Sequence, residues 1–298
     1  MKMIAPATFG TSDLTSSVAI TETEWTAGTY ETGTLRYVGT DLYEVTADPD
    51  TDDEPTAGAA KDPATWVKIG KINRWKMFSG IIAEKTEQTG GPIEVEIEPG
   101  SVVNAVAFFG VEATSVTVEV DDPAEGIVYS RTEPMIDNSG VTDWFNYFFS
   151  PILRKEEVVF LDLPSYGSAS VKAEIAAGET GDVAVGEMVI GAQRDLGSTV
   201  LEFTAGIRDF SRKEQNDFGG FEILQRRFSR FAEFEVFMPK NRVPGLIRAL
   251  ADRRALPTVY IGNEDDPETI IYGYYTDQQV LRVAPGHSEL SLTIEGLT

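Results

Sequence analysis

The sequence has no cysteine, and it has a single histidine, His287, among 298 residues. Without thiols the chain forms neither disulfides nor thiolate metal sites, and one imidazole leaves too few nitrogen ligands for zinc. No apolar run approaches the roughly 20 residues that span a bilayer, and residues 1–17 lack the basic and then apolar order of a secretory signal. We therefore expect a protein made in the cytoplasm, with no metal, no cofactor and no membrane insertion.

Basic residues are also scarce, because 25 of them face 48 acidic residues and leave a net charge of −23. Binding to free nucleic acid depends on Lys and Arg that neutralise phosphates, so we do not expect that partner. Residues 1–70 carry 12 acids and 4 bases, residues 71–196 carry 21 and 9, and residues 197–298 carry 15 and 12. The last third gathers its bases in one cluster: Arg208, Arg212, Lys213, Arg226, Arg227 and Arg230. A salty habitat would account for the acidic body, but the asymmetry indicates a surface that meets a partner.

Catalytic motifs are missing as well. No G-x-S-x-G turn occurs, and His287 lies in the turn APGHSEL, where Ser288 is the neighbouring hydroxyl. Adjacent acids such as Glu156 and Glu157 are expected by chance among 48 carboxylates, so they do not indicate glycoside hydrolysis. We expect no enzyme activity and no catalytic residues.

An acidic stretch resembles a calcium loop in spacing only. Asp48, Asp50 and Asp52 match the first three ligand positions, but Asp53 stands where the loop needs glycine. Ala59 occupies the position of the bidentate glutamate. A solvated acidic loop is therefore the preferred interpretation of residues 46–63, which contain no large apolar residue.

Four runs alternate apolar and polar side chains with the period of a half-buried strand. Their apolar members are Ile93, Val95 and Ile97; Val116, Val118 and Val120; Val171, Ala173 and Ile175; and Leu290, Leu292 and Ile294. The run TVYIGNEDDPETIIYGYY adds two strands around an acidic turn. The sequence thus predicts a mainly β protein.

One segment, residues 241–254, has helical spacing instead. Its apolar residues recur at i, i+3, i+4 and i+7, at Val243, Leu246, Ile247 and Leu250. Asn241 is a suitable cap, and a proline falls in the tolerant first turn.

Composition breaks divide the chain into four parts. We expect an N-terminal arm at 1–17, a small module at 18–72 that contains the acidic loop, a β-sandwich at 73–195, and a β domain with one helix at 196–298. The second break is GAQRDLGST at 191–199.

Aromatic residues are dense in two places. A module of about fifty residues must bury most of its rings, so we expect Trp25, Tyr37 and Trp66 in its core. Tyr30 and Tyr43 are then the expected exposed rings, on which a sugar could stack. The run DWFNYFFSP, residues 143–151, is too dense for one strand face and needs a cover, either the sandwich or a neighbouring subunit.

The first module is similar to small chitin- and cellulose-type carbohydrate-binding modules. The resemblance rests on Trp25, Gly28, Tyr30, Gly33, Tyr37, Tyr43, Pro63 and Trp66. The segment 158–191 looks like a galectin- or lectin-like β-sandwich of the kind inserted in phage tail-tip proteins.

The last segment, from GFEILQRRF to the end, resembles tail-tip or baseplate proteins of long-tailed bacteriophages, in the style of the distal tail protein. The motifs PTVYIG, YGYYTD and LSLTIEGL carry this resemblance. It implies a C-terminal split-barrel-like β domain and a virion subunit that forms a trimeric or hexameric ring. The implied partners are other copies of the chain, the tail tube, hub or tape measure, and a host surface glycan. A receptor- or glycan-binding protein is the alternative, and a glycosidase is a third.

The ring interface is expected in the last domain. In RFSRFAEFEVF, Phe231 and Phe237 fall on a polar strand face, beside the bases Arg226, Arg227 and Arg230. Large rings on such a face indicate burial against a second subunit. The alternative is that the helix at 241–254 covers both rings within one chain.

Overall fold

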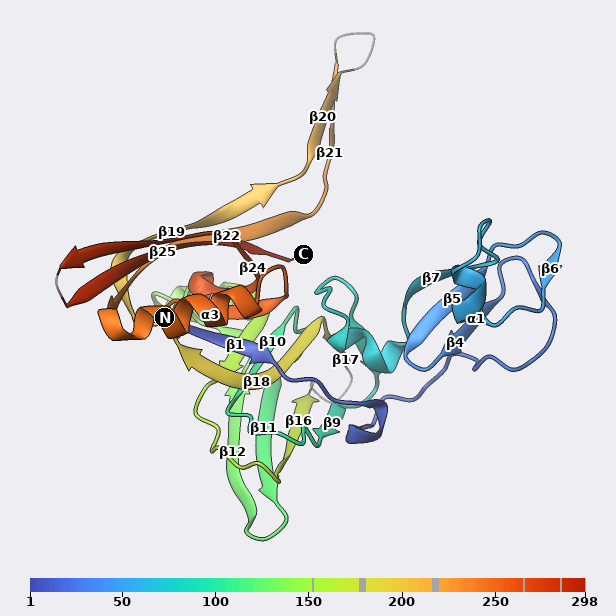
Figure 1. Cartoon of the computed structure of the whole chain (residues 1–298), viewed down its shortest axis with the longest axis horizontal. Helices are drawn as coiled ribbons and strands as arrows, with labels where there is room; N and C mark the ends of the chain where they lie inside the picture. The colour runs from blue at the N-terminus through green and yellow to red at the C-terminus, as the bar shows by residue number, and fades with distance from the viewer. Residues whose placement is uncertain (152, 177–180, 216–219, 265, 285, 298) are drawn as a thin grey trace.

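The computed structural model describes residues 1–151, 153–176, 181–215, 220–264, 266–284 and 286–297. Two large antiparallel sheets form the body of the protein, and a small module projects to one side of it (Figure 1). The prediction of a mainly β fold with one main helix is confirmed.

The first sheet has nine strands in the order β15-β10-β18-β1-β23-β24-β25-β22-β19. In that order their bounds are Glu157–Phe160, Ala105–Phe109, Glu187–Asp195, Lys2–Pro6, Thr258–Ile261, Ile270–Ala284, His287–Gly296, Phe228–Pro239 and Ser198–Asp209. The second sheet has five strands, in the order β12-β11-β16-β9-β2. Their bounds are Gly126–Pro134, Ser115–Asp122, Ser170–Ala176, Ile93–Ile97 and Leu14–Ser16.

Residues 1–17 were predicted as an arm, but they supply a strand to each large sheet. Strand β1 pairs with β18 on one side and with β23 on the other, and β2 pairs with β9. Met3 and Ile4 are buried on opposite faces of β1, which is why this short segment is held in the sheet. The division of the remaining chain at residues 72 and 195 stays a prediction.

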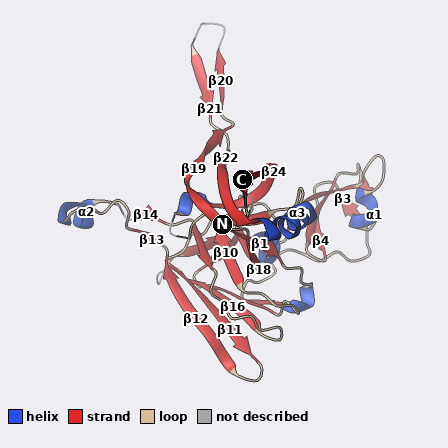
Figure 2. Cartoon of the chain, turned by 60° about the vertical axis from the view of Figure 1, so that its left-hand side comes forward, coloured by secondary structure: helices blue, strands red, loops and turns tan. Residues whose placement is uncertain are grey.

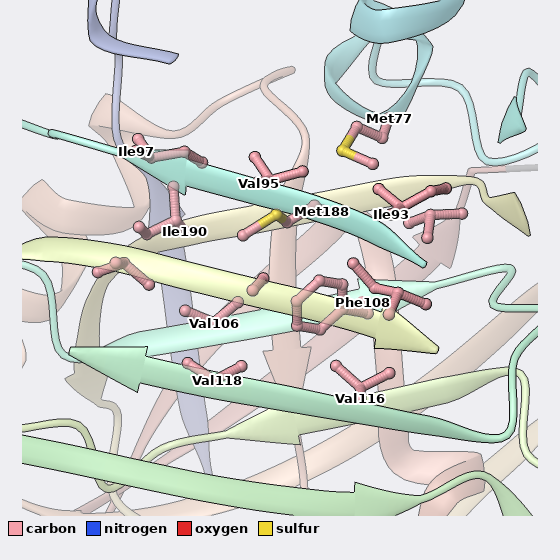
Figure 3. Packing of buried hydrophobic residues seen from close by; sticks show 14 of the residues in the cluster. Met77, Ile93, Val95, Ile97, Val106, Phe108, Val116, Val118, Met188 and Ile190 are labelled. Atoms are coloured by element: carbon pink, nitrogen blue, oxygen red, sulfur yellow. The ribbon is translucent and has the colours of Figure 1, made fainter. Parts of the chain in front are cut away.

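The sandwich core lies between the five-stranded sheet and strands β15, β10 and β18. Figure 3 shows Ile93, Val95 and Ile97 of β9 on one side of this core, with Phe108 of β10 and Met188 of β18 among the residues that face them. All twelve apolar members of the four alternating runs are buried. The period of two therefore identified the inward faces of these strands correctly.

The second half of the large sheet curls over helix α3, Val243–Asp252. Leu246, Ala249 and Leu250 of the helix are buried in one core with residues of β22 and β25. Pro244 lies in the first turn as predicted, but Arg242 rather than Asn241 is the N-cap residue. Ile247 is 41% exposed, so the buried stripe of the helix is narrower than predicted.

The small module is built on a three-stranded sheet of β4 (Leu35–Val38), β5 (Asp41–Val45) and β7 (Trp66–Lys71). A short pair, β3 (Tyr30–Glu31) and β6 (Asp50–Thr51), and helix α1 (Pro55–Ala59) complete it. Its core consists of Tyr43, Val45 and Trp66, with Trp25 and Tyr30 packed partly against them.

The acidic stretch 46–63 was predicted as a solvated loop, but part of it packs on Trp66. The indole Nε1 donates a hydrogen bond to the backbone oxygen of Asp53 over 3.0 Å. Gly58 of α1 lies so close that an added Cβ would come within 2.4 Å of the Trp66 ring. Small residues let this stretch approach the indole, which a count of large apolar residues does not reveal.

The remaining elements lie in connections and in two projections. They are η1 (Thr11–Asp13), η2 (Asn73–Phe78), β8 (Thr86–Thr89), β13 (Ile136–Asp137), α2 (Trp144–Phe149), β14 (Leu153–Arg154), β17 (Asp182–Val185), β20 (Arg212–Gln215), β21 (Phe221–Leu224), η3 (Lys240–Arg242) and η4 (Pro267–Thr269). The pairs β8–β17, β13–β14 and β20–β21 are two-stranded.

A buried carboxyl joins three parts of the molecule. Glu187 of β18 is 5% exposed and accepts hydrogen bonds from the backbone nitrogen of Gly80 at 2.9 Å and from the Tyr272 hydroxyl at 3.2 Å. Gly80 follows η2, which leads from the small module, and Tyr272 belongs to β24. Burial raises the pKa of Glu187 from 4.5 to about 8, because the charged form is poorly solvated there.

The raised pKa of Glu187 predicts a loss of stability with pH. The folded state holds the proton more tightly than the unfolded state, so its contribution is complete below pH 4.5 and falls as the pH rises toward 8. Glu187→Gln, which cannot ionise, should raise the unfolding free energy by about 2–4 kcal/mol at pH 8 and leave it nearly unchanged at pH 4.5. Urea unfolding at both values measures this. Equal gains at the two values would contradict it.

Trp66 should determine the stability of the small module. Trp66→Ala removes a fully buried indole and should cost about 3–5 kcal/mol, which exceeds what a module of this size has in reserve. Trypsin should then cleave at Lys61 and Lys68 while the body stays intact. Val67→Ala, at a neighbouring position that is 44% exposed, is the control and should resist cleavage like the wild type.

Candidate functional site

A two-stranded hairpin extends the large sheet away from the body. Strands β20 and β21 pair from Arg212 with Leu224 to Gln215 with Phe221. They continue the edge strand β19 and its neighbour β22 (Figure 1). Every residue of both strands is exposed. A two-stranded hairpin is marginally stable by itself in water. We therefore expect another surface to cover it.

The hairpin is both apolar and basic. Phe221, Ile223 and Leu224 are 61%, 73% and 50% exposed, and the Lys213 ammonium lies 3.7 Å from the centre of the Phe221 ring. Arg226 and Arg227 are exposed at its base, as is Phe228 at 50%. This surface, called the hairpin arm from here on, comprises residues 210–215 and 220–228.

The sheet that carries the hairpin arm has an acidic outer face. Glu233 and Glu235 of β22 alternate with buried residues, and the paired strand β25 contributes Glu289 and Glu295 to the same face. A hydrogen bond with Glu235 raises the pKa of Glu289, because two neighbouring carboxyls cannot both ionise freely. Among the described residues, the ion pairs of these four carboxylates are limited to Arg208 with Glu295 at 2.7 Å.

The predicted interface rings lie on this acidic face. Phe237 is 38% exposed, whereas Phe231 is half-buried and leans against Gly206 of β19. Helix α3 packs on the opposite face, against Phe234 and its buried neighbours. The alternative that the helix covers both rings is therefore wrong, and their role in a ring stays a prediction.

Arg230 was predicted with the interface but is engaged within the chain. Its Nη1 lies 2.7 Å from Oε1 and 2.6 Å from Oε2 of Glu157, so both carboxylate oxygens share one guanidinium nitrogen. Glu157 belongs to β15, the edge strand of the sandwich half, although six strands separate it from β22 in the order of the sheet. The pair therefore ties the two halves of the curled sheet together. Of the three predicted interface bases, Arg226 and Arg227 have no ion pair among the described residues.

The aromatic run 143–151 forms a second projection. It includes helix α2, at the end of an arm whose stem is the β13–β14 pair (Figure 2). Five rings of this helix, here called the aromatic tip, are 64–78% exposed: Trp144, Phe145, Tyr147, Phe148 and Phe149. The sandwich does not cover them, so that expectation is wrong. A cover by a neighbouring subunit stays a prediction.

The two expected sugar-stacking rings are not an open platform. Tyr43 was expected to be exposed and is only 6% exposed, because β5 directs it into the small core. Tyr30 is half-buried, with its hydroxyl 2.6 Å from the backbone oxygen of Thr26 and the Arg36 guanidinium carbon 4.9 Å from its ring centre. The glycan-binding role of these tyrosines is a prediction that this geometry does not favour.

A groove of about 420 Å³ crosses the outer face of the five-stranded sheet. Its polar lining includes Thr15, Ser17, Glu94, Glu96, Thr117, Glu119, Lys172 and Glu174. Glu94 and Glu174 lie directly opposite each other on β9 and β16, an arrangement of like charges that lowers the stability of the sheet. Sequence periodicity marks these residues as outward-facing but does not show that they share a groove.

Neither a cluster of metal ligands nor a membrane-spanning helix occurs in the described part of the chain. No three His, Asp or Glu side chains there gather closely enough to hold a metal ion. No helix in that part is both long and apolar enough to cross a membrane.

Comparisons with known proteins add little. No family model matches the chain, and no curated protein matches it. A solved structure of a chitosan-binding module 1 mutant, derived from a chitosanase/glucanase of Paenibacillus sp. IK-5, is 13% identical, with a TM-score of 0.27 over 40% of this chain and 83% of that chain. At that score the likeness carries no argument about function. No comparison matches the chain to a phage-tail protein.

Proposed function

We propose that this protein is a structural subunit that assembles into a symmetric ring, in the tail tip or baseplate of a long-tailed bacteriophage. The observation that carries the proposal is the hairpin arm, whose apolar and basic surface is not covered by any of the residues that the structure describes. The assignment to a phage tail comes from the resemblance of residues 220–298, and it implies a location in the virion and contacts with other tail proteins. The proposal includes no catalytic activity.

The contact joins two different surfaces of neighbouring copies. The hairpin arm of one subunit, with Arg226 and Arg227 at its base, lies on the acidic outer face of the next, formed around Glu233 and Glu235. Opposite charges select this partner and orient it, and Phe221 and Ile223 become buried in the contact. Such a head-to-tail contact closes into a ring when its rotation divides a full turn.

Reversing charges across this contact tests the proposal. Arg226→Glu with Arg227→Glu should weaken association at least tenfold, about 1.4 kcal/mol, because like charges then face each other. Glu233→Lys with Glu235→Lys should weaken it similarly, and combining the four changes should restore the ring. Analytical ultracentrifugation and negative-stain images of the particles measure this.

The control for the charge reversal is Lys68→Glu, on the small module, which should leave the ring unchanged. Raised salt should weaken the wild-type ring, since exposed ion pairs are screened. A wild-type protein that stays monomeric at high concentration would refute ring assembly. If the variant with all four substitutions does not reassociate, the pairing of these two surfaces is refuted.

A second candidate function is glycan binding, and the groove on the five-stranded sheet favours it. Its hydroxyls and carboxylates offer the donors and acceptors that sugar hydroxyls need, within a concave surface of suitable size. This function is compatible with ring assembly, because the groove lies on the other sheet from the hairpin arm.

The groove predicts a defined pattern of glycan binding. Glu94→Gln with Glu174→Gln should weaken binding of a chitosan or cellulose oligosaccharide by about tenfold, about 1.4 kcal/mol. Relief of the carboxylate pair should leave the melting temperature equal or higher. Tyr43→Phe, which alters the small module, is the control. Calorimetry with no heat for the wild type would remove this function.

A further inference from the structure

The aromatic tip exposes rings around most of its circumference. With 3.6 residues per turn, Trp144, Phe145, Tyr147, Phe148 and Phe149 leave Asn146 as the one polar direction of the six-residue helix. Both the pair Phe145 and Phe149 and the pair Tyr147 and Phe148 have ring centres about 5 Å apart. Among the residues that the structure describes, the ring contacts of the tip are all within the tip itself.

The arm holds the tip well away from the body. Its stem begins beside Met135, which is fully buried. The backbone nitrogen of Lys155 donates a hydrogen bond to the backbone oxygen of Met135 at 3.0 Å. Ile136 and Leu153 in the stem are 41% and 51% exposed. Figure 2 shows α2 at the far end of this arm, separate from the hairpin arm and from the small module.

The tip is almost free of charge in a strongly acidic chain. Between Asn138 and Leu153 the sequence contains one charged residue, Asp143. That carboxylate caps the helix, since its Oδ1 accepts a hydrogen bond from the backbone nitrogen of Asn146 at 2.8 Å. The surface therefore presents rings without a net charge that would select an ionic partner.

We infer that the aromatic tip inserts into the interface of a zwitterionic lipid bilayer. A groove on a protein covers one side of a helix, whereas rings around most of a helix suit a medium that surrounds it. Trp and Tyr favour the headgroup region of a membrane, and this interfacial region is where short helices bury their apolar side chains. This contact differs from the spanning insertion that the sequence argues against.

Charge decides which membrane is suitable. The chain carries a net charge of −23, so an anionic bilayer repels the body while a phosphocholine bilayer does not. The neutral tip supplies no lysine or arginine cluster of the kind that holds proteins on anionic lipids. The partner is therefore a phosphocholine-like surface, bound through ring burial rather than through ion pairs.

The test uses the full chain and phosphatidylcholine vesicles. The wild type should sediment with the vesicles, and its tryptophan emission should shift to shorter wavelength because Trp144 is 78% exposed in water. Trp144→Phe should keep most of the binding but lose the shift, since Trp66 is buried and Trp25 and Trp75 are packed partly against the cores, away from the tip. A Trp144→Phe protein that retains the full shift would overturn the inference.

Matched variants separate this contact from ring assembly. Trp144→Ser with Phe148→Ser should reduce vesicle binding at least tenfold and leave the ring and the melting curve unchanged. Phe221→Ser with Ile223→Ser in the hairpin arm should weaken the ring and leave vesicle binding unchanged. Replacing a third of the lipid by phosphatidylglycerol at low salt should weaken wild-type binding. The inference fails if the wild type does not bind vesicles. It also fails if the tip variants bind vesicles like the wild type.

Discussion

The whole architecture depends on the double pairing of strand β1. Its backbone bonds to β18 of the sandwich and to β23 of the C-terminal half, so one short strand makes a single sheet out of two. Met3 enters the core beneath helix α3, and Ile4 enters the core beside β10. An N-terminal segment thus completes structures formed by residues more than 180 positions away.

Two polar contacts reinforce this junction. Arg230 reaches from β22 to Glu157 on β15, and Glu187 holds Gly80 and Tyr272 in the interior. Ile4 of β1, which lies between β18 and β23 in the sheet, is fully buried. The two halves of the sheet therefore form one body. The exposed apolar rings therefore concentrate on projections, the hairpin arm and the aromatic tip, where the body provides no cover (Figure 2). The proposed recognition surfaces therefore lie on the arms, and the buried core lies in the sheets.

Much of the body follows from local patterns. Alternation along β9, β11, β16 and β25 predicted which side chains point inward, because a strand buried on one face reads with a period of two. Helical spacing predicted α3, with an error at its cap and at Ile247. The density of rings in a small module predicted that Trp66 is in the core. It did not show that Tyr43 is buried too, because the pattern of a short strand fits a ring that faces the core as well as one that faces solvent.

By itself, the sequence determined the fold class, the one main helix, the inward faces of the long strands and the excess of charge. The charge follows from composition alone, and the other three depend on residues that are neighbours in the chain. The tertiary structure alone decided that residues 1–17 join both sheets, that Arg230 is paired with Glu157, and that α2 stands exposed on an arm. These features depend on contacts between residues far apart in sequence, and the free energy that selects them comes from packing and pairing that no local pattern records.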